Sequence, residues 1–310
     1  MVSSINTIMY NLSLLNKKNE KVTYGLSSKE ALQYGSDNSQ QYNQILSIKN
    51  SVKTYDSILE RIQLSTAYNT TSDTAVASMK DSMESVQSLI TQALTATTNS
   101  DGKVTIANEI ESLKDGIYSL ANSNIDGQYL FSGKNSDTQA FQKDEITGKI
   151  TYTGSNDNKT VNVETNTYKT QGLNGLELLY YTDETTSTQV SIFDDLDEII
   201  NALKQQDSNG NTITQDEAND ILSKALDKVE NAYDTINLSH AKLGIRTASI
   251  ENFESIVQTK LTNFTILEEN YASADLTALA IESLSLESTY TALYSTINKV
   301  NNLSLVKYLS

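Results

Sequence analysis

The sequence has no proline and no cysteine, and its only histidine is His240. A chain of 310 residues with average usage would carry about 15 prolines. Their absence favours long uninterrupted helices, because a proline inside a helix costs about 3 kcal/mol. Without cysteine the chain cannot form a disulfide, a thiolate metal site or a cysteine nucleophile. A single histidine also excludes a metal site built from several histidines.

Positive charge is also scarce, since 23 Lys and Arg face 39 Asp and Glu, giving a net charge of −16. No basic run is longer than Lys17-Lys18. Nucleic acids and anionic membranes bind clustered cations, so we expect neither as a partner. No apolar run approaches the ~18 residues that span a bilayer. The first residues also lack a secretory signal. These signals predict a cytoplasmic protein, or one exported without a cleaved signal.

Apolar residues at both ends of the chain recur at alternating spacings of three and four, which is typical of a narrow coiled-coil seam. A lone helix pair with such seams buries too little apolar area to offset backbone ordering, at about 1–2 kcal/mol per residue. We therefore expect the terminal segments to pair and to become ordered on assembly. The residues proposed for this assembly interface are Ile5, Ile8, Leu12, Leu15, Val22, Leu286, Tyr290, Leu293, Ile297 and Val300.

Between the ends, helical spacing gives way once to strand-like alternation. A helix is predicted over about 41–97, and alternation with Gly- and Asn-rich turns predicts hairpins over about 131–190. The fold class is therefore mainly α: an elongated rod of long antiparallel helices with paired N- and C-terminal coiled-coil segments and one small β-rich inserted domain. The expected divisions are terminal segments 1–40 and 270–310, a helical core rod at 41–130 and 191–269, and an inserted domain at 131–190.

Two loops superficially resemble ligand-binding motifs. "DGQYLFSGKNS" (126–136) contains Gly133-Lys134, which resembles part of a P-loop. A P-loop needs four residues between its glycines and Ser or Thr after the lysine. Here five residues separate Gly127 from Gly133, and Asn135 follows Lys134. "DSNGNTITQDEA" begins at Asp207 with EF-hand spacing, but it has Thr212 where glycine is required and Ala218 where glutamate is required. We interpret the second loop as a turn before a capped helix.

Isolated titratable residues are also better explained by structure than by chemistry. His240 falls on a helical seam without a nearby nucleophile, which favours a satisfied helix histidine. The acidic run Asp194, Asp195, Asp197 and Glu198 stands at a predicted helix start, where carboxylates complement the helix dipole. We therefore expect no catalytic, cofactor-binding or metal-binding residues, and no enzyme. The rival to a structural role is an enzyme or a soluble ligand-binding module that uses the insertion. A screen of the purified protein for bound nucleotide, sugar or metal separates these hypotheses.

Three stretches resemble the bacterial flagellin superfamily, and within it the hook-associated branch. "NSNIDGQYLFSGKNSDTQAF" (122–141) is similar to the junction between the family's last N-terminal core helix and its β domain. "AKLGIRTASIEN" (241–252) resembles the start of its long C-terminal helix. The last segment, 269–310, resembles its terminal helix and ends in "LSLVKYLS". The loop "LSSKEALQYGSDNS" (26–39) departs from the family pattern, because it lacks Gly after Ser28 and the closing Asp-Pro.

The resemblance implies a structural role in flagellum-dependent motility, as an adaptor layer that joins the hook to the filament. It implies export through the flagellar type III apparatus and an extracellular position at the hook–filament junction. The implied partners are the first hook-associated protein, flagellin, copies of the chain in a ring or layer, and an export chaperone. The alternative within the family is flagellin itself, the filament subunit.

Overall fold

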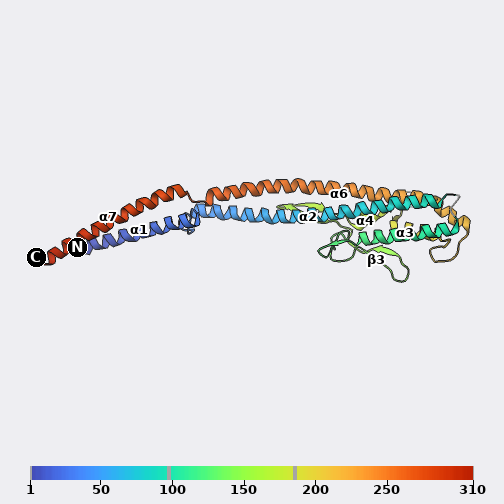
Figure 1. The fold of residues 1–310 in the computed structure, drawn as a ribbon, viewed down its shortest axis with the longest axis horizontal. Helices are drawn as coiled ribbons and strands as arrows, with labels where there is room; N and C mark the ends of the chain where they lie inside the picture. Colours follow the sequence, from blue (N-terminus) through green and yellow to red (C-terminus); the bar gives the residue numbers. More distant parts are fainter. Residues whose placement is uncertain (1, 96–98, 184–186, 310) are drawn as a thin grey trace. The chain divides into compact units, whose positions relative to one another are not determined.

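The computed structural model describes residues 2–95, 99–183 and 187–309, and most of them lie in long helices (Figure 1). The prediction of a mainly α chain of long helices, with paired terminal segments and a small β-rich insertion, is confirmed. The helices longer than ten residues are α1 (Val2–Ser28), α2 (Ser39–Ala93), α3 (Ser100–Ala121), α5 (Ile192–Leu203), α6 (Gln215–Ala272) and α7 (Leu276–Leu309).

The chain divides into two compact units. Unit 1 comprises residues 1–56 and 258–310, and unit 2 comprises residues 57–257. The boundaries fall inside α2 and α6, so two continuous helices contribute to both units.

Unit 1 consists of antiparallel helix pairs. α1 packs against α7, since Tyr290 contacts Asn16 while Leu279 lies against Gly25. The first part of α2 runs antiparallel to the end of α6, where Tyr55 stacks on Phe264 with ring centroids 5.4 Å apart. Among the described side chains of this unit, the buried apolar residues are Val22, Ile45 and Leu286 only. Unit 1 therefore has almost no closed core.

Unit 2 holds the hydrophobic core of the described chain. A continuous cluster of buried side chains runs from Tyr68 on α2 through α3 and α5 to Leu243 on α6. Phe141 and Phe193 meet at its centre, edge to face, with ring centroids 5.5 Å apart. The inserted β segment thus shares one core with the helices.

The insertion consists of short hairpins, and the described strands pair two by two, all antiparallel. Their order follows the sequence, and the short helix α4 stands before the last pair. The strands and this helix are β1 (Asn124–Ile125), β2 (Gln128–Tyr129), β3 (Phe141–Lys143), β4 (Ile150–Tyr152), β5 (Lys159–Glu164), β6 (Thr167–Gln171), α4 (Gly175–Leu179), β7 (Tyr180–Thr182) and β8 (Gln189–Ser191).

Polar caps set the starts of three helices around this insertion. The side chains of Asn99, Asn174 and Ser191 accept hydrogen bonds from the first-turn amides of α3, α4 and α5. Such caps satisfy amides that have no partner within the helix and are typically worth about 1 kcal/mol each. They therefore fix where the chain changes from hairpin to helix.

Gly133 occupies the tightest turn of the insertion, and we predict that Gly133→Ala is costly. Its φ is +66°, and a Cβ there would lie 2.3 Å from the backbone oxygen of Ser155. We expect a loss of about 3 kcal/mol or more in the free energy of unfolding, measured by urea denaturation. The matched control is Gly127→Ala, whose φ is +76° but whose Cβ would meet open space. This control should cost only about 1–2 kcal/mol, and equal losses would contradict the packing argument.

Candidate assembly site

The terminal helix pair, α1 with α7, is the candidate assembly site. Tyr290 Oη donates a hydrogen bond of 2.7 Å to Asn16 Oδ1 across the pair. Nearer the other end, a Cβ on Gly25 would lie 2.6 Å from Leu279 Cδ1, so the missing side chain lets the two helices approach closely. At these two points α1 and α7 therefore contact each other directly.

The predicted interface residues are only partly covered by this pairing. Val22 and Leu286 are buried. The half-buried ones are Ile8, Leu12, Leu15, Tyr290, Leu293 and Ile297. The side chains of Ile5 and Val300 lie outside the described residues. Two helices in contact cover one stripe of each other, which leaves the flanks of that stripe open.

A second set of apolar side chains on these helices was not predicted from the sequence. We call it the outer face; it comprises Tyr10, Leu14, Ile281 and Leu284, all exposed. At about 100° per residue, Tyr10, Ile281 and Leu284 lie across their helices from the seam. Leu14 instead borders a groove between the two helices. Tyr10 is 65% exposed and Leu284 is 68% exposed. The leucines and aromatic residues between the seam positions were the sequence signal that could have revealed this outer face.

A groove of about 640 Å³ opens along the terminal helix pair. One wall carries Lys17, Lys18 and Lys21, and the other includes Leu279 and Glu282. Lys21 is paired with Asp37 of the loop that follows α1. This small cationic strip is unusual in a chain of net charge −16.

The two connections beneath the pair are bonded to each other. Ala31 N donates to Ala272 O at 2.7 Å, and Ala274 N donates to Lys29 O at 2.9 Å. These bonds form an isolated antiparallel bridge between Glu30 and Ser273. The loop that departs from the flagellin pattern is therefore anchored to the end of α6 and to the connection between α6 and α7.

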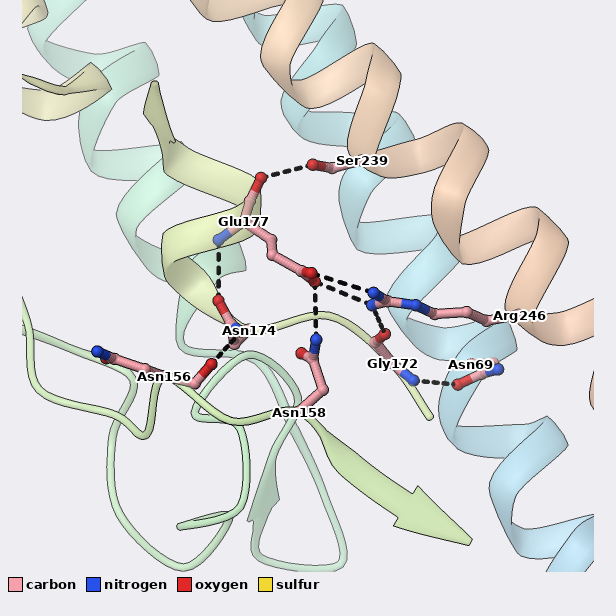
Figure 2. Close-up of polar contacts among 8 residues, drawn as sticks. All are labelled: Asn69, Asn156, Asn158, Gly172, Asn174, Glu177, Ser239 and Arg246. Atoms are coloured by element: carbon pink, nitrogen blue, oxygen red, sulfur yellow. Dashed lines mark hydrogen bonds and ion pairs between the residues drawn. The ribbon is translucent and has the colours of Figure 1, made fainter. Parts of the chain in front are cut away.

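In unit 2, an ion pair fastens the insertion to α6 (Figure 2). The Arg246 guanidinium binds both oxygens of Glu177, at 2.9 and 3.0 Å, and also donates to the carbonyl of Gly172 at 2.7 Å. Ser239, about two helical turns before Arg246 on α6, donates to the backbone carbonyl of Glu177 at 2.5 Å. Such two-pronged pairing fixes direction as well as distance.

Asparagines complete this network from the other side. Asn158 donates to the Glu177 carboxylate at 3.0 Å, and Asn174 donates to Asn156 O at 2.9 Å (Figure 2). Asn69 on α2 is fully buried and accepts from Gly172 N at 2.9 Å. Helices α2 and α6 therefore both hold the segment that leads into α4, and we call this network the polar clamp.

The environment of Glu177 has opposing effects on its pKa. Burial raises the pKa of this carboxyl, but the Arg246 guanidinium and the Asn158 amide more than offset that effect. The pKa consequently lies below its usual value. The clamp is thus a charged pair at neutral pH.

The other sequence candidates have structural partners. Lys134, beside Gly133 in the loop that connects β2 to β3, pairs with Asp157 at 2.7 Å. Asp207 accepts from the amides of Asn209 and Asn211 in its own turn, both at 2.8 Å. The interpretation of a turn before a capped helix is confirmed.

His240 and the acidic run are similarly engaged. His240 Nε2 lies 2.8 Å from Asp73 Oδ1, which joins α6 to α2 and confirms a satisfied helix histidine. Asp195 is buried at the start of α5, where it accepts from Tyr181 Oη at 2.7 Å and lies 3.3 Å from Lys228 Nζ. Burial raises the pKa of this carboxyl. Within the described residues, no His, Asp and Glu cluster could hold a metal ion.

Membrane insertion has no candidate in the described helices, since none combines the length and apolarity of a bilayer span.

Comparisons with known proteins point in one direction. Residues 2–136 match the family described as the bacterial flagellin N-terminal helical region. A putative flagellar hook-associated protein from Vibrio parahaemolyticus superposes with a TM-score of 0.65 at 16% identity, covering 76% of this chain and 100% of that one. The chain has the fold of flagellar hook-associated proteins. Curated protein sequences give no significant match.

Two Legionella pneumophila structures are similar as well. The flagellar hook associated protein-3 gives a TM-score of 0.61 at 15% identity, over 73% of this chain and 98% of that one. The flagellar junction protein FlgL gives 0.55 at 15% identity, over 67% of this chain and 99% of that one. The shared fold thus extends over nearly the whole of each hook-associated structure.

We predict that Arg246→Met loosens the insertion. The variant keeps much of the side-chain length but leaves the half-buried Glu177 carboxylate without its cation, at a cost of about 2 kcal/mol in the free energy of unfolding. Lys134→Met is the matched control, because the Lys134–Asp157 pair is exposed and should contribute at most about 1 kcal/mol. Urea denaturation of both variants measures the difference. Equal losses in the free energy of unfolding would show that the clamp contributes no more to stability than an exposed ion pair.

The Arg246–Glu177 pair should make the free energy of unfolding depend on pH. The folded-state pKa of Glu177 is depressed, so its stabilisation is present above the unfolded pKa of about 4.3 and is lost as the pH falls through the folded pKa. The stability gap between wild type and Arg246→Met should therefore narrow as the pH falls from about 5 towards 3. Denaturation at several pH values measures it; a constant gap would rule out a contribution from the ionised pair.

Proposed function

We propose that the chain is a structural subunit of the bacterial flagellum that forms an adaptor layer between the hook and the flagellin filament. The observation that carries the proposal is the contrast between the two units. Unit 1 has three buried apolar residues among its described side chains, while the outer face of its terminal helices stays exposed. Exposed apolar surface next to an incomplete core is typical of an interface that closes on assembly. The fold shared with hook-associated proteins supports the same role.

The proposed partners follow from an adaptor's position. The first hook-associated protein would meet one end of the layer, flagellin the other, and copies of the chain would lie alongside. An export chaperone would cover the apolar C-terminal helix before assembly. Export through the flagellar type III apparatus would place the protein outside the cell at the hook–filament junction. A repeated contact between identical copies closes a ring or extends a helix. A layer of limited height therefore requires that its two ends bind different proteins, here the first hook-associated protein and flagellin.

The filament subunit is the alternative, because the matched N-terminal region carries a flagellin family description. The similarity to a hook associated protein-3 and to a junction protein over nearly their full lengths favours the adaptor. Purified full-length protein seeded with flagellin filaments separates the two functions. An adaptor should not elongate the seeds into long fibres of itself, whereas a flagellin should.

The direct test is to image labelled protein on flagella of the bacterium that encodes this chain, together with a deletion strain. The label should form one short band between hook and filament. The deletion strain should keep its hooks, lose its filaments and release flagellin into the medium. Label along the whole filament would favour the filament subunit instead.

We predict that Leu284→Asp blocks assembly without unfolding the monomer. Leu284 is 68% exposed, so a carboxylate there is solvated in the free chain but would be desolvated at the proposed interface. Incorporation into flagella, measured by immunoblot of purified flagella, should fall at least about tenfold, with unchanged helicity by circular dichroism. Leu238→Asp is the control, because Leu238 is 59% exposed on α6 in unit 2. Equal incorporation of both variants would show that the outer face stays in solvent.

Leu293→Asp tests the seam in the same assay. Leu293 is half-buried between α1 and α7, so the carboxylate should weaken this pair and also abolish incorporation. The structure of residues 45–270 should persist, because the core of unit 2 does not include Leu293. Normal incorporation of this variant would contradict a packed seam in the assembled state.

A further inference from the structure

The turn between β3 and β4 presents an isoleucine to solvent. Ile146 is 96% exposed. The turn around it is nevertheless well fixed, since one Asp144 carboxylate oxygen accepts from Ile146 N at 3.0 Å and from Thr147 N at 2.7 Å. Gly148, with φ of +70°, closes the turn by donating to Asp144 O at 2.9 Å. Ile146 is therefore an exposed apolar side chain held on an ordered turn, and we call residues 144–148 the knob.

The charge on this knob is negative. The cations that flank it are engaged at the base of the hairpin, where Lys143 pairs with Asp115 at 3.1 Å and Lys149 pairs with Asp194 at 3.3 Å. These pairs also hold the hairpin to α3 and α5, and in Figure 1 β3 lies on the side of α3 that faces away from α6. Glu145, beside Ile146, takes part in none of the ion pairs found among the described residues.

A pocket of about 350 Å³ lies elsewhere in unit 2, between α2 and the hairpins β1–β2 and β5–β6. Its apolar lining includes Leu64, Ile125 and Val161. Leu64 is 69% exposed at the mouth, whereas Val161 is buried. A cavity of about 150 Å³ is enough for a benzene-sized group, so this pocket has room for an isoleucine side chain and part of its neighbour.

The polar part of the pocket is cationic. Arg61 and Lys159 both line it, opposed by the single carboxylate of Asp126. Lys159 Nζ is held 5.0 Å from the centre of the Tyr68 ring and donates to Gln128 at 2.5 Å.

With its cationic groups beside an apolar lining, the pocket suits an apolar side chain accompanied by an anionic one.

We propose that Ile146 of one copy inserts into this pocket on a second copy, with Glu145 directed to Arg61 and Lys159. The exposed Ile146 side chain and its acidic neighbour Glu145 thus match an apolar pocket that also carries two basic side chains. Ile146 does not fill the pocket of its own chain, because it is exposed there. The contact joins two different surfaces of identical subunits, so it is heterologous and can be repeated around a ring. The inference rests on the proposed function, since an adaptor layer requires contacts between neighbouring copies.

This contact alone is too small for a stable dimer. Specific interfaces bury about 1,200–2,000 Å², whereas burial of one isoleucine changes an association constant by roughly 10- to 100-fold. The contact should therefore be populated within an assembled layer, where neighbouring copies are held at high effective concentration. Its role is to fix the register of adjacent subunits.

The natural absence of cysteine permits a clean crosslinking test with full-length chains. Cells co-express an Ile146→Cys copy and a Leu64→Cys copy, and purified flagella are oxidised and analysed for disulfide-linked dimers. We expect a dimer between the two variants. The control replaces Ile146→Cys with Leu238→Cys, which is exposed on α6, and should give at least tenfold less dimer. Both substituted side chains of the test pair are solvent-exposed, so neither variant should unfold.

The outcomes separate this inference from the proposed function. If the protein is absent from purified flagella, the proposed adaptor role fails. If it is present without the dimer, or if the Leu64→Cys copy links only to a different flagellar protein, the second-copy contact is wrong. Charge reversal gives an independent measure. Glu145→Lys in one copy and Arg61→Glu in the other should each lower the dimer yield severalfold, and both together should restore it; no restoration would overturn the charge pairing.

Discussion

The narrow contact between α1 and α7 is the constraint on which the proposed assembly depends. Two helices can bury only the stripe along which they touch, so most seam residues of unit 1 stay half-buried. In unit 2 the helices surround a shared core with the insertion, and large side chains such as Phe131, Phe141 and Phe193 are completely buried. A helix pair without a third covering element is marginal in water. We infer that the missing cover comes from neighbouring subunits.

The polar clamp has a different role from the hydrophobic core. It ties the backbone around Gly172 and Glu177 to side chains of α2 and α6, so the insertion cannot shift along the helices without breaking charged hydrogen bonds. Apolar packing is tolerant of small shifts, whereas bidentate pairing is not. Core burial therefore supplies stability, and the clamp determines where the hairpins, with their knob and pocket, are presented.

Much of this fold could be predicted from local patterns. Seam spacing located the terminal helices, and strand-like alternation located hairpins near Ile150 and Val161, because periodicity reports which side of an element is covered. The same patterns could not reveal the outer face, since they do not distinguish a residue covered by its own chain from one covered by a neighbour. Nor could they pair Arg246 with Glu177, which lies 69 residues away. Such contacts depend on how helices and hairpins meet in space.

Amide hydrogen exchange tests the central claim most directly, because it measures local opening of each helix. In the free full-length chain, amides of α1 and α7 should exchange at least about a hundredfold faster than those of α3 and α5, which lie against the core of unit 2. After incorporation into flagella, exchange in α1 and α7 should slow to a comparable rate. Strong protection of α1 and α7 in the free monomer would contradict the account, because the terminal helix pair would then be stable without neighbours.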